Sequence, residues 1–229
     1  MKEYTLAFDV YGTLIDTSGI REAVSELIGS RANEFTEQWR TKQLEYSFRR
    51  GLMDDYVPFS VCTSQALDYC CNKFGIDISE TDKQGLMVRY KTLPAFPEVA
   101  EGLSTLKGLG YRLFAFSNGM PKDVRSLLEH NGLGYFFDGV VSADSVKTFK
   151  PNPRIYKHFN NVTDSKSRDT WLVSSNPFDV LGSVKYGMNS IWIQRNERNK
   201  MDPWEISYTL TTDGLTKIGR MLSEYRKLN

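Results

Sequence analysis

The sequence is poor in the residues that build disulfide frameworks and zinc sites, with three cysteines and two histidines among 229 residues. Three is an odd number, and Cys70 and Cys71 are adjacent, so we expect reduced packing residues of a cytoplasmic protein rather than disulfides. His130 and His158 lie far apart, with no Cys or acidic cluster at zinc-ligand spacing. We therefore expect neither a zinc site nor a histidine-based triad.

Charge of one sign and long apolar runs are also missing. The 29 Lys and Arg balance 28 Asp and Glu, so we expect no nucleic-acid partner and no membrane partner. No apolar stretch approaches the roughly 18 residues of a membrane span, and the first residues read as a strand rather than a secretory signal. What is present is a 40% hydrophobic chain that can bury a full core as one domain plus an insertion.

The chain opens on a short apolar run, residues 4–8, followed by Asp9 and a glycine turn that leads to Thr13. A short apolar run that ends in a turn is typical of a buried strand in a parallel sheet. An aspartate at the carboxyl end of such a strand lies where open α/β sheets bind ligands. Taken alone, Asp9 is equally well explained as a cap of the following turn.

Helical periodicity runs through residues 15–95, with helices expected over 20–28, 33–51, 58–75 and 80–90. From residue 98, helix and strand alternate, which is typical of a doubly wound parallel sheet. We therefore predict an α/β fold. Its Rossmann-like parallel-sheet core comprises residues 1–14 and 96–229, and a helical cap subdomain is inserted at 15–95.

Polar groups stand at the ends of the expected core strands. These strands cover 111–116, 139–142, 170–173 and 190–193, and the tail adds a short strand near Tyr208 and a helix from about Asp213. Pro151 is expected to open a further helix. The polar groups are Asp9 with Thr13, Ser117 with Asn118, Lys150, and the run from Ser174 to Asp179. One such group is ordinary turn chemistry, but four on one sheet edge predict a ligand site.

This set of residues resembles the haloacid dehalogenase (HAD) superfamily along the whole chain. The matching motifs are Asp9-x-Tyr11-Gly12-Thr13, Ser117-Asn118, Lys150-Pro151 and the terminal Asp179. Most members of that superfamily are phosphatases, with a second aspartate two residues after the nucleophile and a Gly-Asp pair for magnesium. Here those positions hold Tyr11 and Ser174-Ser175. The resemblance therefore implies a leaving group that needs neither a proton nor a metal, such as a halide.

The insertion narrows the resemblance to the L-2-haloacid dehalogenases. The matching segments are Trp39-Arg40, Lys42-Gln43-Leu44-Glu45-Tyr46, residues 8–14 and Val173 to Asn176. Arg40 shares a helix face with Leu44 and Phe48, where a cation usually snorkels, but the resemblance favours an arginine that stabilises a leaving halide. Thr41 and Phe178 depart from the subfamily pattern of Gln and Trp, which leaves the substrate range open.

The implied function is that of an (S)-2-haloacid dehalogenase that converts short L-2-haloalkanoic acids to D-2-hydroxy acids, without cofactor or metal. By the resemblance, Asp9 is the nucleophile that forms an ester, Lys150 keeps it ionised, and Thr13 and Ser174 orient it. Only the resemblance suggests a homodimer. Two alternatives remain: a magnesium phosphatase, which Tyr11 disfavours, and a non-catalytic anion-binding protein, in which a carboxylate such as Asp9 would repel the ligand.

The remaining roles implied by the resemblance concern the water and the substrate. Asn176 and Asp179 position or activate the water that hydrolyses the ester. Tyr156, one helical turn beyond Lys150, either hydrogen-bonds within this set or packs in the core. Ser117 and turn amides hold the substrate carboxylate. The residues expected to contact the substrate are Val10, Tyr11, Arg40, Leu44, Phe59, Ser117, Asn118 and Phe178.

Overall fold

The computed structural model describes residues 4–228, so residues 1–3 and 229, at the outer bounds of the expected core, lie outside the described residues. Its centre is a six-stranded parallel sheet in the order β3-β2-β1-β4-β5-β6. The strands are β1 (Thr5–Phe8), β2 (Arg112–Ser117), β3 (Gly139–Ser142), β4 (Thr170–Ser174), β5 (Asn189–Ile193) and β6 (Leu210–Thr212). The predicted α/β fold is confirmed.

The first strand occupies the centre of this sheet. All four residues of β1 are buried, and Phe8 stands opposite Ala115 of β2 and Val173 of β4. The chain builds outward from β1 to β3 in one direction and from β4 to β6 in the other. The order therefore reverses between β1 and β4, and open α/β sheets form their ligand crevice outside the carboxyl ends of strands at such a switch point.

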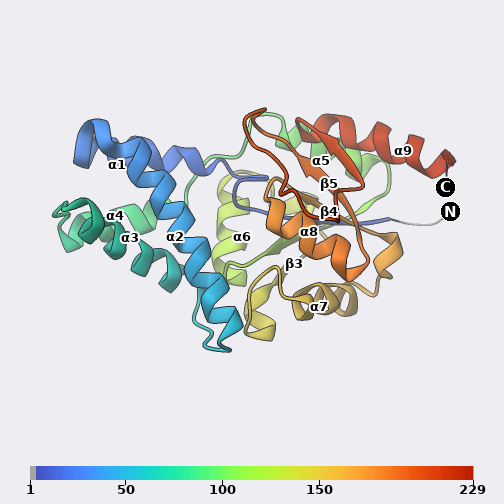
Figure 1. Ribbon diagram of the computed structural model, residues 1–229. Coiled ribbons are helices and arrows are strands. Elements are labelled where there is room, and N and C mark those ends of the chain that lie inside the picture. The colour runs from blue at the N-terminus through green and yellow to red at the C-terminus, as the bar shows by residue number, and fades with distance from the viewer. Residues whose placement is uncertain (1–3, 229) are drawn as a thin grey trace.

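Helices cover both faces of the sheet (Figure 1). The helices around the sheet are α5 (Val99–Gly108), α6 (Pro121–His130), α7 (Pro153–Thr163), α8 (Pro177–Tyr186) and α9 (Ile218–Leu228). Alternate strand residues face opposite ways, so Leu6 and Phe8 join the hydrophobic cluster of α5, α6 and α9, whereas Ala7 joins that of α7.

Four helices between β1 and α5 stand to one side of the sheet, at the left of Figure 1. They are α1 (Ile20–Ile28), α2 (Ala32–Leu52), α3 (Phe59–Phe74) and α4 (Glu80–Arg89), and they pack on one another. Trp39 of α2 ties this group together, because its indole Nε1 donates to Thr63 O of α3 at 2.8 Å and its ring contacts Tyr90. A bridge between Ile15 and Ala95 brings the two connecting segments side by side. Within residues 4–228, no helix has the length and apolarity that crossing a bilayer requires.

The expectation that Pro151 opens a helix is wrong. The Lys150-Pro151 peptide is cis and lies in a turn, and α7 begins two residues later at Pro153. Asn152 decides this start, because its side chain accepts a hydrogen bond from Arg154 N at 3.0 Å. This cap gives a partner to the backbone N–H of Arg154, the second residue of the helix. Pro153, the first residue, has no N–H that needs a partner.

The tail also differs from expectation at its element ends. The predicted short strand near Tyr208 is present as Leu210–Thr212, and Tyr208 itself precedes it and packs on Trp192. The final helix begins at Ile218, after a short 3-10 turn, and not at about Asp213.

Candidate active site

The polar residues predicted at the strand ends meet at the carboxyl edge of the sheet. Asp9 directly follows β1, and Ser174 ends the neighbouring strand β4. Lys150 lies in the loop after β3, and Asp179 lies in the first turn of α8. Hydrogen bonds between these side chains join segments more than 140 residues apart. The edge where they meet is the β1–β4 switch point.

The carboxylate of Asp9 is held in one orientation. Its Oδ2 accepts three hydrogen bonds, from Thr13 Oγ1 at 2.8 Å, Ser174 Oγ at 3.1 Å and Asn176 Nδ2 at 2.6 Å. Its Oδ1 faces Lys150 Nζ at 3.3 Å. Asp9 is 7% exposed, so the carboxylate can still be reached from outside. One oxygen is therefore engaged by three donors, and the other carries a single long contact among the described residues.

Lys150 stands between two carboxylates. Its Nζ is 3.3 Å from Asp9 Oδ1 and 2.6 Å from Asp179 Oδ2, and it donates to Phe116 O at 2.8 Å. An ammonium has three protons, and this buried one has three acceptors. Asn118 Oδ1 accepts from Lys150 N at 2.8 Å, which fixes the loop that carries the lysine. An ammonium thus supplies the positive charge between these two acids.

Asp179 is the acid of the site with a strongly shifted pKa. Burial raises its pKa to about 6, because Lys150 opposes the shift only in part and Asp9 adds to it. Tyr156 donates from its hydroxyl to Asp179 Oδ1 at 2.8 Å. The ring of Tyr156 also packs on Phe116, so the residue both hydrogen-bonds within the set and packs in the core. Burial, followed by the charge of Asp179, raises the pKa of Tyr156.

Sequence reasoning gave no role to Ser175 or Arg195, which support the turn after Asp9. Ser175 Oγ donates to Gly12 O at 2.6 Å, and Ser175 N donates to Thr13 Oγ1 at 2.9 Å. Gly12 has φ +84°, a backbone conformation that disfavours other residues. Arg195, after β5, donates to Thr13 O. Ser175 stands in the segment that resembles the family, at a position where phosphatases have their Gly-Asp pair, but that pattern did not indicate its contacts with the turn; no motif surrounds Arg195.

Val10 and Ser117, two of the predicted contacts with substrate, are largely enclosed. The side chain of Val10 lies in the hydrophobic core, and its carbonyl accepts hydrogen bonds within the turn, so only its backbone can face a ligand. Ser117 Oγ accepts from Gly119 N at 3.0 Å. The hydroxyl proton of Ser117 remains to be donated.

Arg40 brings a positive charge from α2 toward the sheet edge. Burial lowers the pKa of this guanidinium, and three neighbouring groups oppose the lowering: Tyr90, Asp9 and Tyr11. Its Nη1 donates to Gln43 Oε1 at 2.6 Å. The structure therefore places Arg40 within the electrostatic reach of the carboxylate that follows β1.

The side chains predicted to form the pocket wall lie in two separate places. Leu44 packs in a cluster with Phe59 and Phe149, and the ring of Tyr11 lies 6.5 Å from that of Phe59. Phe178 is not in this cluster, because its ring packs instead on Phe48 of α2, with 5.0 Å between the ring centroids. Phe149 lies beside Lys150 and escaped sequence reasoning, since a lone aromatic in a loop carries no signal.

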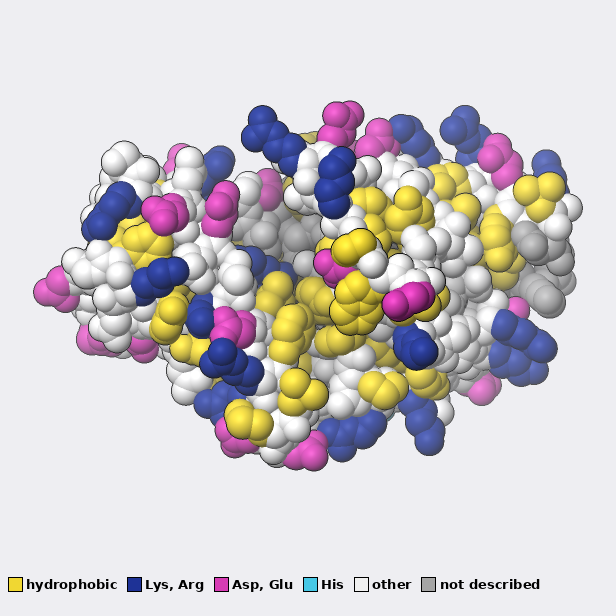
Figure 2. Space-filling model, in the orientation of Figure 1, with side chains coloured by type: hydrophobic (Ala, Val, Ile, Leu, Met, Phe, Trp, Pro, Cys, Tyr) yellow, Lys and Arg dark blue, Asp and Glu magenta, His cyan; other side chains and the backbone are white. Residues whose placement is uncertain are grey.

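A cleft of about 390 Å³ continues from these walls between α3 and α4 on one side and α6 on the other. It is lined by Tyr11, Phe59, Gly119, Met87 and Met120, among others, and by an ion pair of Lys91 with Asp123 at 3.4 Å. Figure 2 shows hydrophobic side chains gathered in the middle of the molecule, where the two parts meet. The cleft is therefore suited to an apolar group attached to a ligand at Asp9.

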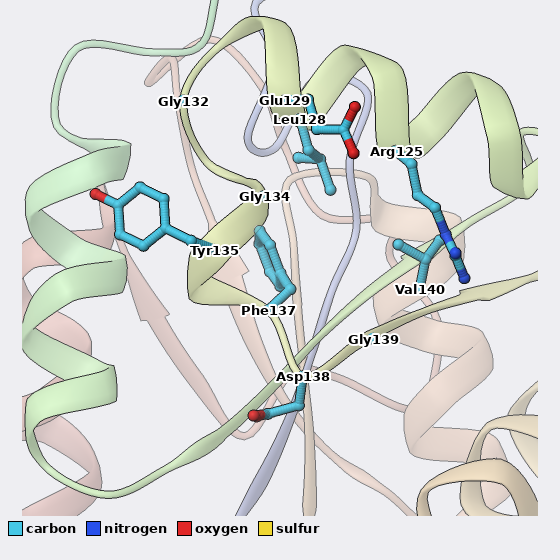
Figure 3. A pocket seen from close by; sticks show the side chains of 10 residues that line it. All are labelled: Arg125, Leu128, Glu129, Gly132, Gly134, Tyr135, Phe137, Asp138, Gly139 and Val140. Atoms are coloured by element: carbon cyan, nitrogen blue, oxygen red, sulfur yellow. The ribbon is translucent and has the colours of Figure 1, made fainter.

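A second hollow, of about 540 Å³, lies between α6 and β3 (Figure 3). It contains none of the predicted site residues. Its Asp138 is paired with Lys107, and its Tyr135 is mostly exposed. Across residues 4–228, no group of three or more His, Cys, Asp or Glu is placed to hold a metal ion. The strand-end cluster is thus the best candidate site.

Comparison with known proteins agrees with this geometry. A family model of haloacid dehalogenase-like hydrolases matches residues 5–185. The chain is 34% identical to an (S)-2-haloacid dehalogenase of Pseudomonas sp. (strain YL), over 88% of this chain and 89% of that protein. It superposes on an L-2-haloacid dehalogenase of Xanthobacter autotrophicus with a TM-score of 0.91 and 27% identity, covering 97% and 99% of the two chains. A structure from the same organism with chloropropionic acid covalently bound gives a TM-score of 0.91 and 26% identity, covering 96% and 98%.

Proposed function

Since this chain belongs to the haloacid dehalogenase-like hydrolase family, we propose that it is an (S)-2-haloacid dehalogenase, a hydrolase that acts on carbon–halide bonds. Its substrates are short L-2-haloalkanoic acids. The observation that carries this proposal is the Asp9 carboxylate, fixed by three donors on one oxygen and facing a buried ammonium with the other. The relatives favour neither a phosphatase nor a non-catalytic binding protein.

In the first step, Asp9 Oδ1 attacks the halogen-bearing carbon of the substrate. A carbon–oxygen bond forms, the carbon–halogen bond breaks, and the halide leaves with the bonding electron pair. Oδ1 is the attacking oxygen because Oδ2 is engaged by Thr13, Ser174 and Asn176. Lys150 pairs with the carboxylate through Nζ, which lies 3.3 Å from Oδ1.

Substrate orientation comes from both sides of the cleft. Ser117 donates its free hydroxyl proton to the substrate carboxylate, aided by turn amides that include Val10 N. Arg40 stabilises the departing halide from the cap side, joined by the amide of Asn118. The alkyl group lies against Tyr11, Leu44 and Phe59, whereas Phe178, which packs on Phe48, does not join this wall. The nucleophile and the halide then stand on opposite sides of the reacting carbon, which enforces inversion.

In the second step, water attacks the Asp9 carbonyl carbon, and ionised Asp179 accepts a proton from this water. The bond between that carbon and the ester oxygen then breaks, Asp179 returns its proton to the departing oxygen of the 2-hydroxy acid, and the new Asp9 carboxyl group releases a proton to solvent. Tyr156 positions Asp179 through the 2.8 Å hydrogen bond, and Asn176 holds the ester beside it. One water oxygen is thereby built into the Asp9 carboxylate, and the chiral carbon is not touched again.

Halide release from the two enantiomers of 2-chloropropionate, with and without EDTA, tests this function. We expect the L-substrate to give D-lactate and chloride at a rate that EDTA leaves unchanged, and the D-substrate to be nearly inert. Asp9→Asn serves as the inactive control. L-lactate from the L-substrate, or equal use of both enantiomers, would contradict the proposed arrangement of the site.

We also propose that residues 15–95 act as a cap subdomain on a core of residues 1–14 and 96–229. The mutual packing of α1 to α4 supports this division. The free, buried thiols of Cys62, Cys70 and Cys71 support a reducing, cytoplasmic setting. A homodimer rests on the family likeness alone, and sedimentation analysis tests it.

A further inference from the structure

The guanidinium of Arg40 is anchored by a single neighbour. Among the hydrogen bonds of the described residues, its one acceptor is Gln43 Oε1, which lies 2.6 Å from Nη1. Gln43 is one helical turn further along α2 and is 1% exposed. A long arginine side chain loses considerable rotamer freedom when it is fixed, so the position of Gln43 decides where this cation is held.

Gln43 is itself held by the neighbouring helix. Its Nε2 donates to Thr63 Oγ1 of α3 at 2.5 Å, and Thr63 Oγ1 donates in turn to Phe59 O at 3.0 Å. Trp39 Nε1 donates to Thr63 O at 2.8 Å, which fixes the two helices at this point. A continuous relay therefore runs from the backbone of α3 to the guanidinium of Arg40.

The polarity of the relay is determined from both ends. At one end the Phe59 carbonyl can only accept, so the Thr63 hydroxyl points its proton there and offers a lone pair to Gln43. At the other end Arg40 can only donate, so it requires the oxygen of the same amide. Both requirements give one orientation of the Gln43 amide. Without the Thr63 hydroxyl, the buried NH2 group of that amide would lose its acceptor.

We propose that Gln43 and Thr63 are positioning residues for halide departure, which fix the Arg40 guanidinium so that its other N–H groups meet the leaving halide. The proposal rests on the dehalogenase function proposed above. Both residues also line the cleft beyond Tyr11, where they would meet the alkyl chain and not the reacting atoms. They act on the reacting atoms through Arg40. Negative charge on the halide develops in the transition state, so a misplaced guanidinium costs rate more than ground-state binding. Chloride leaves less readily than bromide, so the release of chloride depends more on stabilisation by the Arg40 guanidinium.

The decisive comparison is Thr63→Val with Thr63→Ser, measured as single-turnover halide release from L-2-chloropropionate and L-2-bromopropionate. Valine keeps the shape of threonine without the hydroxyl, whereas serine keeps the hydroxyl. We expect Thr63→Val to slow chloride release by up to about 10-fold, which corresponds to the loss of one hydrogen bond between neutral groups. Bromide release should slow less, and KM should change little. Thr63→Ser should stay within about twofold of the wild type, within the spread of a conservative change.

A second pair of variants covers the glutamine. Gln43→Met should reproduce the chloride-selective loss, whereas Gln38→Met, on the same helix but paired with Lys73, should not. Circular dichroism confirms that each variant is folded. If Gln43→Met does not fold, the comparison of Thr63→Val with Thr63→Ser is sufficient to test the proposal. Equal rates for Thr63→Val and Thr63→Ser, or equal losses with both halides, would overturn the proposed relay. The proposed dehalogenase function would still stand in that case, provided that the wild-type protein releases halide. A wild-type protein that releases no halide would refute the function itself.

Discussion

At the scale of single residues, the site balances two acids against one buried lysine. Asp9, Lys150 and Asp179 were predictable because Asp9 directly follows a strand, and Lys150 and Asp179 lie in the segments that follow two further strands. Three of the hydrogen-bond partners of Asp9 were also predictable: Thr13, Ser174 and Asn176. The next layer was not, because Ser175 and Gln43 are polar residues of kinds that usually face solvent, and nothing in the sequence assigned them to Thr13 and Arg40. Sequence therefore pointed to the charged groups and their immediate partners, but not to the residues behind them.

The raised pKa of Asp179 predicts how turnover depends on pH. Burial raises this pKa to about 6, and the acid must be ionised to accept a proton from water. The rate of ester hydrolysis should therefore fall as pH drops through about 6, approaching a tenfold loss per pH unit below it. A kcat profile from pH 4.5 to 9 measures this.

Replacing Tyr156 tests the assignment of that pH dependence. The hydrogen bond from Tyr156 lowers the pKa of Asp179, so Tyr156→Phe should move the midpoint to higher pH. Tyr135→Phe, at an exposed position, serves as the matched control and should leave the midpoint unchanged. A midpoint that stays in place or moves down in Tyr156→Phe would show that a different group titrates.

At the scale of elements, α2 connects the cap to the site along one face. Arg40, Leu44 and Phe48 follow one another at four-residue spacing, and they reach the Gln43 relay, the Phe59 cluster and the ring of Phe178. The sequence predicted this shared face because helical spacing is a local property. The start of α7 was harder to predict, since prolines at 151 and 153 both suit a first helical position and the Asn152 side chain decides between them.

The cleft between α4 and α6 predicts how the enzyme selects chain length. Its apolar lining gives room for an alkyl chain beyond Tyr11, so 2-bromohexanoate should be accepted. Met120→Trp should fill this space and lower kcat/KM for L-2-bromohexanoate at least about 10-fold, because several methylenes lose their contacts. Turnover of L-2-bromopropionate should change little.

The control for this prediction is Leu109→Trp, which adds the same bulk at an exposed position on the core. That variant should handle both substrates as the wild type does. Parallel losses for the short and the long substrate in Met120→Trp would indicate that the alkyl chain does not enter this cleft.

At the scale of the whole molecule, the strand order of the parallel sheet brings the residues of the site together. Its order reverses between β1 and β4, which places Asp9 beside Ser174 although they are 165 residues apart in the chain. Alternation of helix and strand predicted this architecture, with its helical insertion after the first strand. The exact end of β6 was not predictable, because an edge strand of three residues carries little pattern.

The central claim is that Asp9 forms a covalent ester with its substrate, and single turnover in heavy-oxygen water tests it most directly. With enzyme in excess over L-2-chloropropionate, the first product should be unlabelled, and mass spectrometry of the peptide that contains Asp9 should find the heavy oxygen on its carboxylate. Appearance of the label in the lactate of the first turnover, with Asp9 unlabelled, would contradict the account.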